Sequence, residues 1–141
     1  RIFLGSPRQG QYAMARLEEL AVQCGLTADP GFMDAYARLK MDNLDHVALY
    51  ARFAEQVRRG ETLGADVSIL KVIGSETYQK ISQLMVEAAG SAGGLRDDVE
   101  LAGGSFDWLS NYYSARPATI YGGSCEIQRN VLAAQVLGLP A

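Results

Sequence analysis

The chain has 141 residues, of which 48% are hydrophobic and 21% charged, and its formal net charge is −3. This length and composition fit one folded domain and exclude a disordered chain. The acidic balance argues against a general nucleic-acid binder, and no apolar run approaches the roughly 18 residues of a membrane span.

The sequence offers few ligands for metals and few partners for disulfides. Two cysteines, Cys24 and Cys125, cannot form a disulfide framework or a thiolate metal site, and one histidine excludes most zinc and di-iron centres. We expect that histidine, His46, to be a packed or half-exposed residue of a helical bundle rather than a catalytic one. No signal peptide is recognisable, so we expect a cytoplasmic chain. A start at Arg1 instead of Met leaves open that the chain is a piece of a longer protein.

The first two predicted helices are delimited by clear end signals. Apolar spacing predicts a helix over residues 8–24, with Gly25 as its stop residue. Asp29 and Pro30 then form an N-cap and a first-turn proline for a long helix over residues 31–59, with Gly60 as its stop residue.

The long second helix has two apolar stripes. Such stripes require neighbouring helices, and two of them predict contact with two neighbours. One stripe contains Phe32, Tyr36, Leu39, Val47, Tyr50, Ala54 and Val57, and the other contains Met33, Leu44, Leu49 and Phe53.

A third helix, over residues 66–89, has the cleanest pattern. Its apolar or small residues repeat at intervals of three and four: Val67, Leu70, Gly74, Thr77, Ile81, Leu84 and Ala88. Gly74 lowers helix stability by about 1 kcal/mol relative to Ala, so its place in this seam predicts the close approach of another backbone.

The remaining segments are shorter. We predict a glycine-rich loop over 91–104, an aromatic helix over 105–114, a turn over 115–124 with an extended run at 118–121, and a last helix over 125–137. No alternating strand pattern is present. The fold class is therefore all-α: one domain, residues 1–141, forming an up-down four-helix bundle with an extra short helix.

The segment before the last helix has features of a ligand-binding turn. Gly122 and Gly123 allow a ligand to approach the backbone closely, and Ser124 is a good N-cap. Free amides at a helix N-terminus favour phosphate or carbonyl oxygen. Glycine and serine before a helix can equally form a purely structural cap, so these residues alone do not decide.

The order of residues in this segment is more specific. The run over 120–130, Ile-Tyr-Gly-Gly-Ser-Cys-Glu-Ile-Gln-Arg-Asn, resembles the C-terminal signature of the acyl-CoA dehydrogenase family, and the likeness continues through 137–140. Lys71 and residues 87–94 fall where that family has a lysine and a Gln followed by a glycine-rich turn. The resemblance is dense from Lys71 onward and weak before it.

The resemblance implies the C-terminal helical bundle of an FAD enzyme that also has an N-terminal helical domain and a middle β-domain. Such enzymes convert an acyl-CoA thioester to the 2-enoyl-CoA: a carboxylate removes the α-proton, the flavin accepts the β-hydride, and a separate electron-transfer acceptor reoxidises the flavin.

By the same resemblance, the backbone amide of Gly122 would bind the thioester carbonyl and Tyr121 would line the acyl pocket. The implied cofactor-binding residues are Gly123, Ser124, Glu126, Glu87 and Gly90, the last two meeting the FAD of a neighbouring subunit.

Two positions depart from the family pattern. Gly122 stands where medium-chain-type members have the catalytic Glu; members with Gly there have their base on an upstream helix, which here would precede Arg1. No catalytic residue is therefore assigned, and Glu126 is only a minor alternative base. Glu87 stands where Gln is common, and an ionised carboxylate cannot donate. Members with this Glu and a Gly-Ser turn resemble bacterial enzymes for steroid-side-chain or other bulky CoA thioesters, some of them heteromeric.

Two functions are thus open. The chain is the C-terminal bundle of an acyl-CoA dehydrogenase, or it is a catalytically incompetent association module or non-catalytic subunit derived from that family. In either case we expect a homo-oligomer or hetero-oligomer, because family members assemble through this bundle.

Overall fold

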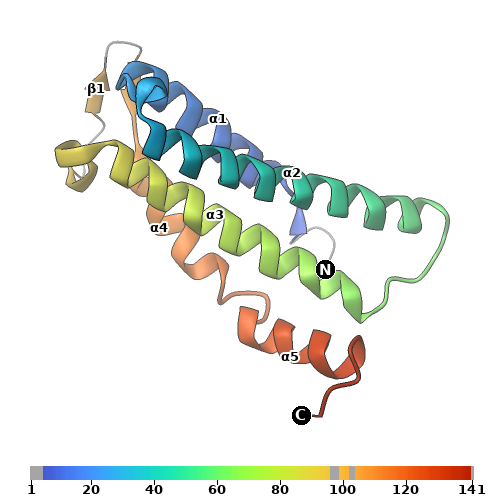
Figure 1. Ribbon diagram of the computed structural model, residues 1–141. Coiled ribbons are helices and arrows are strands. Elements are labelled where there is room, and N and C mark those ends of the chain that lie inside the picture. Colours follow the sequence, from blue (N-terminus) through green and yellow to red (C-terminus); the bar gives the residue numbers. More distant parts are fainter. Residues whose placement is uncertain (1–4, 96–98, 102–103, 141) are drawn as a thin grey trace.

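The computed structural model describes residues 5–95, 99–101 and 104–140, and this part of the chain forms a helical bundle (Figure 1). The predicted all-α fold is confirmed. The α-helices are α1 (Arg8–Gln23), α2 (Pro30–Arg58), α3 (Ser68–Ala88), α4 (Trp108–Ala118) and α5 (Cys125–Gln135). Single 3-10 turns, η2 (Leu26–Ala28), η3 (Ala65–Val67) and η4 (Gly90–Gly94), join them.

Helix α3 is the central element. Helices α1, α2, α4 and α5 all pack against it, whereas α1 and α2 share only a small contact (Figure 1). Helix α5 follows α4 along α3 and reaches η3 at the start of α3. Because α3 has neighbours on several sides, its polar side chains meet other elements as well as solvent.

The ends of the first helices follow the predicted signals. The Asp29 side chain accepts a hydrogen bond of 2.8 Å from the backbone N–H of Phe32, and Pro30 occupies the first turn of α2. Gly25 and Gly60 have φ values of +67° and +75°, which side-chain-bearing residues rarely adopt. Both glycines therefore stop their helices as predicted.

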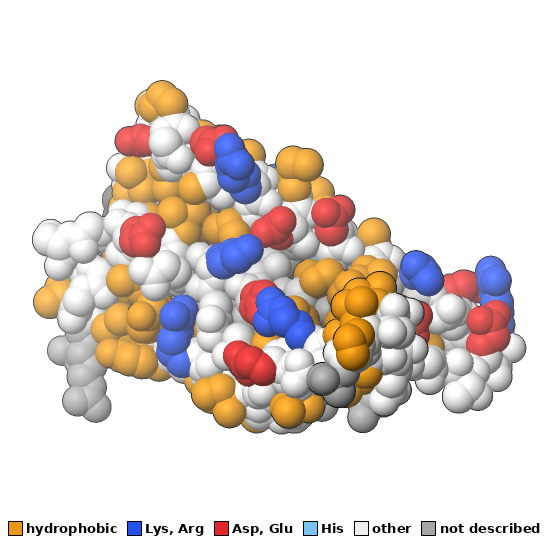
Figure 2. Space-filling model, turned by 60° about the horizontal axis from the view of Figure 1, so that its bottom comes forward, with side chains coloured by type: hydrophobic (Ala, Val, Ile, Leu, Met, Phe, Trp, Pro, Cys, Tyr) orange, Lys and Arg blue, Asp and Glu red, His pale blue; other side chains and the backbone are white. Residues whose placement is uncertain are grey.

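The apolar core has two parts. The larger lies among α1, α3, α4 and the first half of α2, and the smaller joins Phe53 to Val67 and Leu70. The predicted second stripe of α2 is only partly covered: Phe53 is 1% exposed and Leu49 packs against its cluster, whereas Leu44 is 57% exposed. Met41, which lies outside that stripe, is 66% exposed. Figure 2 shows exposed hydrophobic side chains in several patches, separated by charged ones. No helix in the described ranges is long and apolar enough to cross a membrane.

The structure corrects the predicted loop over 91–104. Strands β1 (Val99–Leu101) and β2 (Gly104–Phe106) form an antiparallel hairpin, with Val99 opposite Phe106. Three-residue strands are too short to show an alternating pattern. Phe106 at the end of β2 is 2% exposed and stacks on Trp108, which anchors the hairpin to the bundle. Residues 96–98 and 102–103 of the predicted loop lie outside the described residues.

Helix α4 also differs from the prediction. It begins at Trp108 instead of residue 105, after Asp107, whose side chain accepts from the N–H of Ser110 at 2.8 Å. It continues through Pro117 to Ala118, so the predicted extended run at 118–121 is wrong. The reason lies in side chains of α3, described below, that bind the last carbonyls of α4. Helix α5 ends at Gln135, two residues early, and Gly138 follows with a φ of +66°.

The neighbour of Gly74 is a side chain, not the backbone that was predicted. A Cβ atom at Gly74 would lie 2.6 Å from Cε1 of His46. The His46 ring is 3% exposed, and its Nε2 lies 2.8 Å from the carbonyl oxygen of Gly5. The prediction that His46 packs inside the bundle is confirmed.

This environment gives the stability of the chain a pH dependence. Burial lowers the pKa of His46, while the bond to Gly5 opposes that effect to a smaller degree. Below about pH 6.5 the unfolded chain takes up a proton that the folded chain resists, so the free energy of unfolding should fall from about pH 7 to about pH 5.5. His46→Gln retains an N–H donor and does not titrate, and should flatten this slope. Urea unfolding of both proteins at the two pH values tests this; equal slopes would contradict it.

Candidate functional site

Residues 119–124 form the turn between α4 and α5. Gly122 and Gly123 have φ values of +69° and +95°, and both are exposed. A Cβ atom at Gly123 would lie 2.5 Å from Nε2 of Gln128. The N–H of Cys125 donates to the carbonyl of Thr119 at 2.9 Å and closes the turn. The paired glycines are therefore required by the backbone itself.

The turn presents backbone donors to solvent. No described residue accepts a hydrogen bond from the N–H of Gly122 or Gly123. The Ser124 side chain caps α5 by accepting from the N–H of Ile127 at 3.4 Å, as predicted. Two free amides thus stand beside a helix N-terminus, where the helix dipole favours an oxygen with negative charge.

Side chains of α3 bind the carbonyls at the end of α4. Gln79 Nε2 lies 3.1 Å from the carbonyl oxygen of Ala115 and 3.2 Å from that of Arg116. The Lys71 ammonium donates to the carbonyl of Ala118. The last four carbonyls of α4 belong to residues 115–118, and the remaining one, that of residue 117, accepts hydrogen bonds from backbone N–H groups of the turn. All four terminal carbonyls, which a helix leaves without internal partners, are therefore satisfied.

Helix α5 is held to α3 separately. The Ser75 hydroxyl and the buried thiol of Cys125 lie 3.3 Å apart. The Arg129 guanidinium pairs with the Glu76 carboxylate at 2.7 Å. The turn is consequently fixed at both of its ends by one helix.

Tyr121 lies beside a small cavity. Its side chain is 50% exposed, and the Lys71 ammonium lies 5.7 Å from its ring centroid. The cavity measures about 30 Å³, room for roughly one water molecule, and its wall also includes Ser6, Gln9 and Tyr78. It is far too small for an acyl chain, so an acyl pocket at Tyr121 needs walls from elsewhere.

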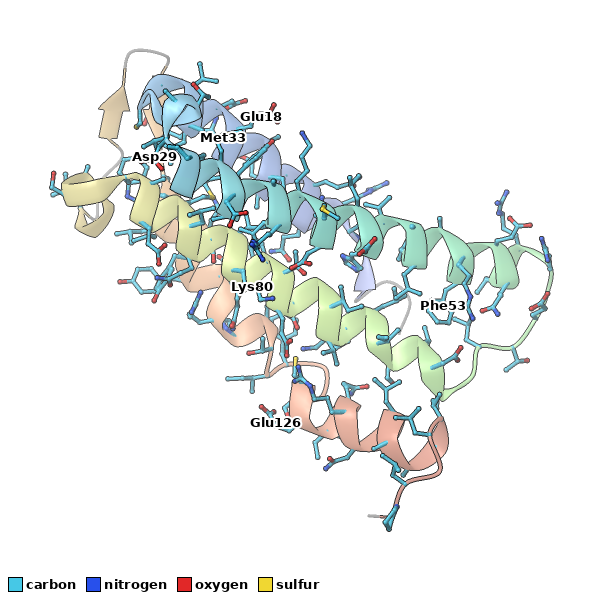
Figure 3. The ribbon with its side chains drawn as sticks, viewed as in Figure 1. Glu18, Asp29, Met33, Phe53, Lys80 and Glu126 are labelled. Carbon is cyan, nitrogen blue, oxygen red and sulfur yellow. The ribbon has the colours of Figure 1, made fainter. Side chains whose placement is uncertain are left out.

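Glu126 is an exposed carboxylate in the first turn of α5, shown in Figure 3. Hydrogen bonds from its own backbone N–H and from the Ser124 hydroxyl lower its pKa, and the charges of Arg129 and Lys71 add to the effect. A lowered pKa makes a carboxylate a weaker base. Glu126 is therefore suited to accept hydrogen bonds and poorly suited to remove a proton.

The structure does not bring all the predicted site residues together. Tyr121, Gly122, Gly123, Ser124 and Glu126 share one turn. Glu87 lies in the last turn of α3, about 18 Å along the helix from Ser75 at 1.5 Å per residue, and Gly90 follows at the start of η4. Glu87 is exposed and accepts a hydrogen bond from Gln83 at 2.9 Å.

Sequence reasoning missed the residues that hold the turn. Lys71, Ser75 and Gln79 are spaced four apart, so they line one face of α3. Ser75 is 8% exposed although it is polar. A polar stripe at helical spacing within an otherwise apolar helix is the signal that could have identified them.

Comparisons with known proteins give the family. Residues 12–137 match the model of the acyl-CoA dehydrogenase C-terminal domain. The acyl-CoA dehydrogenase IpdE1 of Mycolicibacterium smegmatis is 33% identical over 127 residues, which are 89% of this chain and 30% of that protein. Its namesake in Mycobacterium tuberculosis is 32% identical over 90% of this chain and 31% of its own length.

Solved structures show the same fold. A variant of the Tcur3481-Tcur3483 steroid ACAD superposes with a TM-score of 0.81 at 24% identity, over 100% of this chain and 37% of that one. The ChsE4-ChsE5 complex from Mycobacterium tuberculosis gives 0.78 at 23% identity, over 96% of this chain and 36% of that one.

The chain belongs to the acyl-CoA dehydrogenase family, as the match to its C-terminal domain over most of the sequence shows. It spans about three-tenths of the length of the curated relatives.

The geometry of Gly123 predicts a specific cost of substitution. Gly123→Ala should destabilise the chain by about 1–3 kcal/mol, because an alanine rarely holds a φ of +95°. The new Cβ would also meet Nε2 of Gln128, but this atom is the flexible end of a side chain and can move aside. Gly138→Ala is the matched control: its φ of +66° lies in the left-handed region that other residues tolerate better, and its Cβ would meet nothing within 4 Å. Thermal unfolding of both variants measures the difference, and an equal loss in Tm would contradict a larger backbone cost at Gly123.

Proposed function

We propose that this chain is the C-terminal domain of an FAD-dependent acyl-CoA dehydrogenase, and that residues 121–124 bind the thioester carbonyl and one edge of the flavin. The observation that carries the proposal is the exposed turn, where the amides of Gly122 and Gly123 have no partner among the described residues while both flanking helices are fixed to α3. Bundle packing alone does not require such a turn.

The turn suits a reaction in which negative charge develops on a carbonyl oxygen. Removal of the α-proton of a thioester places charge on that oxygen, and a preorganised N–H donor stabilises it. In our proposal the Gly122 amide is this donor and Tyr121 lines the acyl chain. In this proposal the base is a group other than Glu126, whose lowered pKa makes it a weak one.

In our proposal the described residues contact FAD along only one edge of the cofactor. When bound, FAD would accept the hydride from the β-carbon of the substrate. The Ser124 hydroxyl accepts one hydrogen bond within α5 and has a second lone pair available, and the Glu126 carboxylate can accept from a hydroxyl of the cofactor. The adjoining cavity of about 30 Å³ is too small for a flavin ring, so other domains would supply the rest of the site. The distance of Glu87 and Gly90 from the turn favours their contact with a second FAD, in a neighbouring subunit.

In this proposal the class of substrate and the form of the assembly are taken from the relatives. The steroid ACAD and the ChsE4-ChsE5 complex favour a bulky CoA thioester as substrate and a hetero-oligomer or homo-oligomer as the working form. The exposed side chains of Met41 and Leu44 are consistent with further burial in such an assembly. A separate electron acceptor and a cytoplasmic location stay predictions.

A second function, a non-catalytic subunit, is favoured by the low basicity of Glu126, the carboxylate beside the turn. In that case the chain would complete the assembly and leave proton removal to a partner. The two functions differ in whether a flavin bound at this turn is reduced by substrate.

Flavin reduction provides the test. The assembled protein that carries this domain, mixed anaerobically with a bulky acyl-CoA, should lose its visible flavin absorbance. The CoA thioether with the same alkyl group lacks the carbonyl and should not bleach the flavin. Residues 1–141 alone should bind FAD poorly and be inactive. Bound FAD that no thioester reduces would support the non-catalytic subunit, and equal bleaching by the thioether would contradict the role of the Gly122 amide.

Ser124 can be tested separately. Ser124→Ala removes an N-cap, which costs about 1 kcal/mol, together with the hydroxyl that we place against the flavin. We expect the purified assembled protein to contain less FAD, while Ser124→Thr retains wild-type content because it keeps the hydroxyl. Ser114→Ala, at an exposed position of α4, is the control. Full FAD content in Ser124→Ala would show that the Ser124 hydroxyl does not bind the cofactor.

A further inference from the structure

We infer that Lys71 and Gln79 are positioning residues for the Gly122 amide, which they orient by capping the C-terminus of α4 from the neighbouring helix. The inference rests on the proposed function, because it assumes that this amide binds the substrate carbonyl. Neither side chain belongs to the turn or to the proposed ligand contacts.

The C-terminus of α4 is buried against α3. Its last carbonyls require donors from outside the helix, and Ala115 and Ala118 are 0% and 4% exposed, which leaves little room for water. Gln79 Nε2 donates to the carbonyl of Ala115 and also lies 3.1 Å from Oγ1 of Thr119, the first residue of the turn. The Lys71 ammonium donates to the carbonyl of Ala118, the last residue of the helix. The direction in which the chain leaves α4 thus depends on two side chains of α3.

The turn after α4 is held mainly by hydrogen bonds. Ile120 and Tyr121 are 68% and 50% exposed, so apolar packing contributes little. Their N–H groups donate to the carbonyl of Pro117 at 2.9 and 3.0 Å. Both hydrogen bonds require that the last turn of α4 is intact. Hydrogen bonds, and not burial, therefore set the path that leads to Gly122.

The two sides of the turn are held by different contacts. Helix α5 is fixed to α3 by Ser75 and by the ion pair between Arg129 and Glu76, which do not involve Lys71 or Gln79. Loss of the α4 caps should therefore release residues 119–123 while α5 stays in place. The Lys71 charge also favours the negative end of the α4 dipole, so an Arg at this position should partly replace it.

The experiment uses Gln79→Leu and Lys71→Met in the assembled protein. Gln11→Leu and Lys80→Met are matched controls, since Gln11 is exposed on α1 and Lys80 is exposed on α3 (Figure 3). Amide hydrogen exchange at Ile120 and Tyr121 should speed up about 10-fold or more in the two variants, with unchanged exchange in α1 and α2. An amide displaced by about 1 Å should lower kcat by about 10–100-fold. KM should stay within about 3-fold, and Lys71→Arg should recover most of kcat.

Other outcomes would overturn the inference. Unchanged exchange at Ile120 and Tyr121 would show that the caps do not hold the turn, and a raised KM with constant kcat would show a role in binding instead of positioning. If either variant fails to fold, Gln79→Glu and Lys71→Arg replace them: the carboxylate cannot donate and should release the turn, and the guanidinium should hold it. A wild-type protein that oxidises no thioester would refute the proposed function, while the exchange measurements would still decide whether these side chains hold the turn.

Discussion

The C-terminus of α4 is the constraint on which the site depends. A helix that ends among buried residues must find hydrogen-bond donors for its last carbonyls, because water does not reach them. Lys71 and Gln79 provide these donors from α3. Since α1, α2 and α5 also pack against α3, the position of the turn is set by the packing of the whole bundle.

The electrostatics of the turn follow from the same arrangement. The C-terminus of α4 has a negative end of a helix dipole, and the Lys71 ammonium compensates it. The N-terminus of α5 has a positive end, and the lowered pKa of Glu126 is consistent with it: hydrogen bonds from the Glu126 N–H and Ser124 dominate, and the charges of Arg129 and Lys71 add to them. Gly122 lies between these two ends, where an oxygen with developing negative charge is favoured.

Local signals in the sequence predicted much of the fold and the centre of the site. Caps at Asp29 and Ser124 and stops at Gly25 and Gly60 act within a few residues, so their positions can be read without tertiary structure. The end of α4 could not be predicted from the local sequence, because the side chains that donate to its last carbonyls come from residues about 40 positions earlier in the chain. The two short strands lacked a detectable period, and the partner of Gly74 was a side chain from another helix. The sequence likewise could not show that the amides of Gly122 and Gly123 have no partner among the described residues, because this depends on which acceptors lie near them in space.

The bond between His46 and Gly5 has a consequence for how the domain connects to any preceding polypeptide. It fixes the backbone at Gly5, next to Ser6 and Gln9, which form one wall of the cavity beside Tyr121. A residue n positions before Gly5 can reach at most about 3.5 Å × n from that point. Residues 1–4 include no carboxylate. A base on a preceding segment would therefore stand at least five positions before Gly5, on a tether of up to about 18 Å, and the bundle itself would limit the volume that this group could explore.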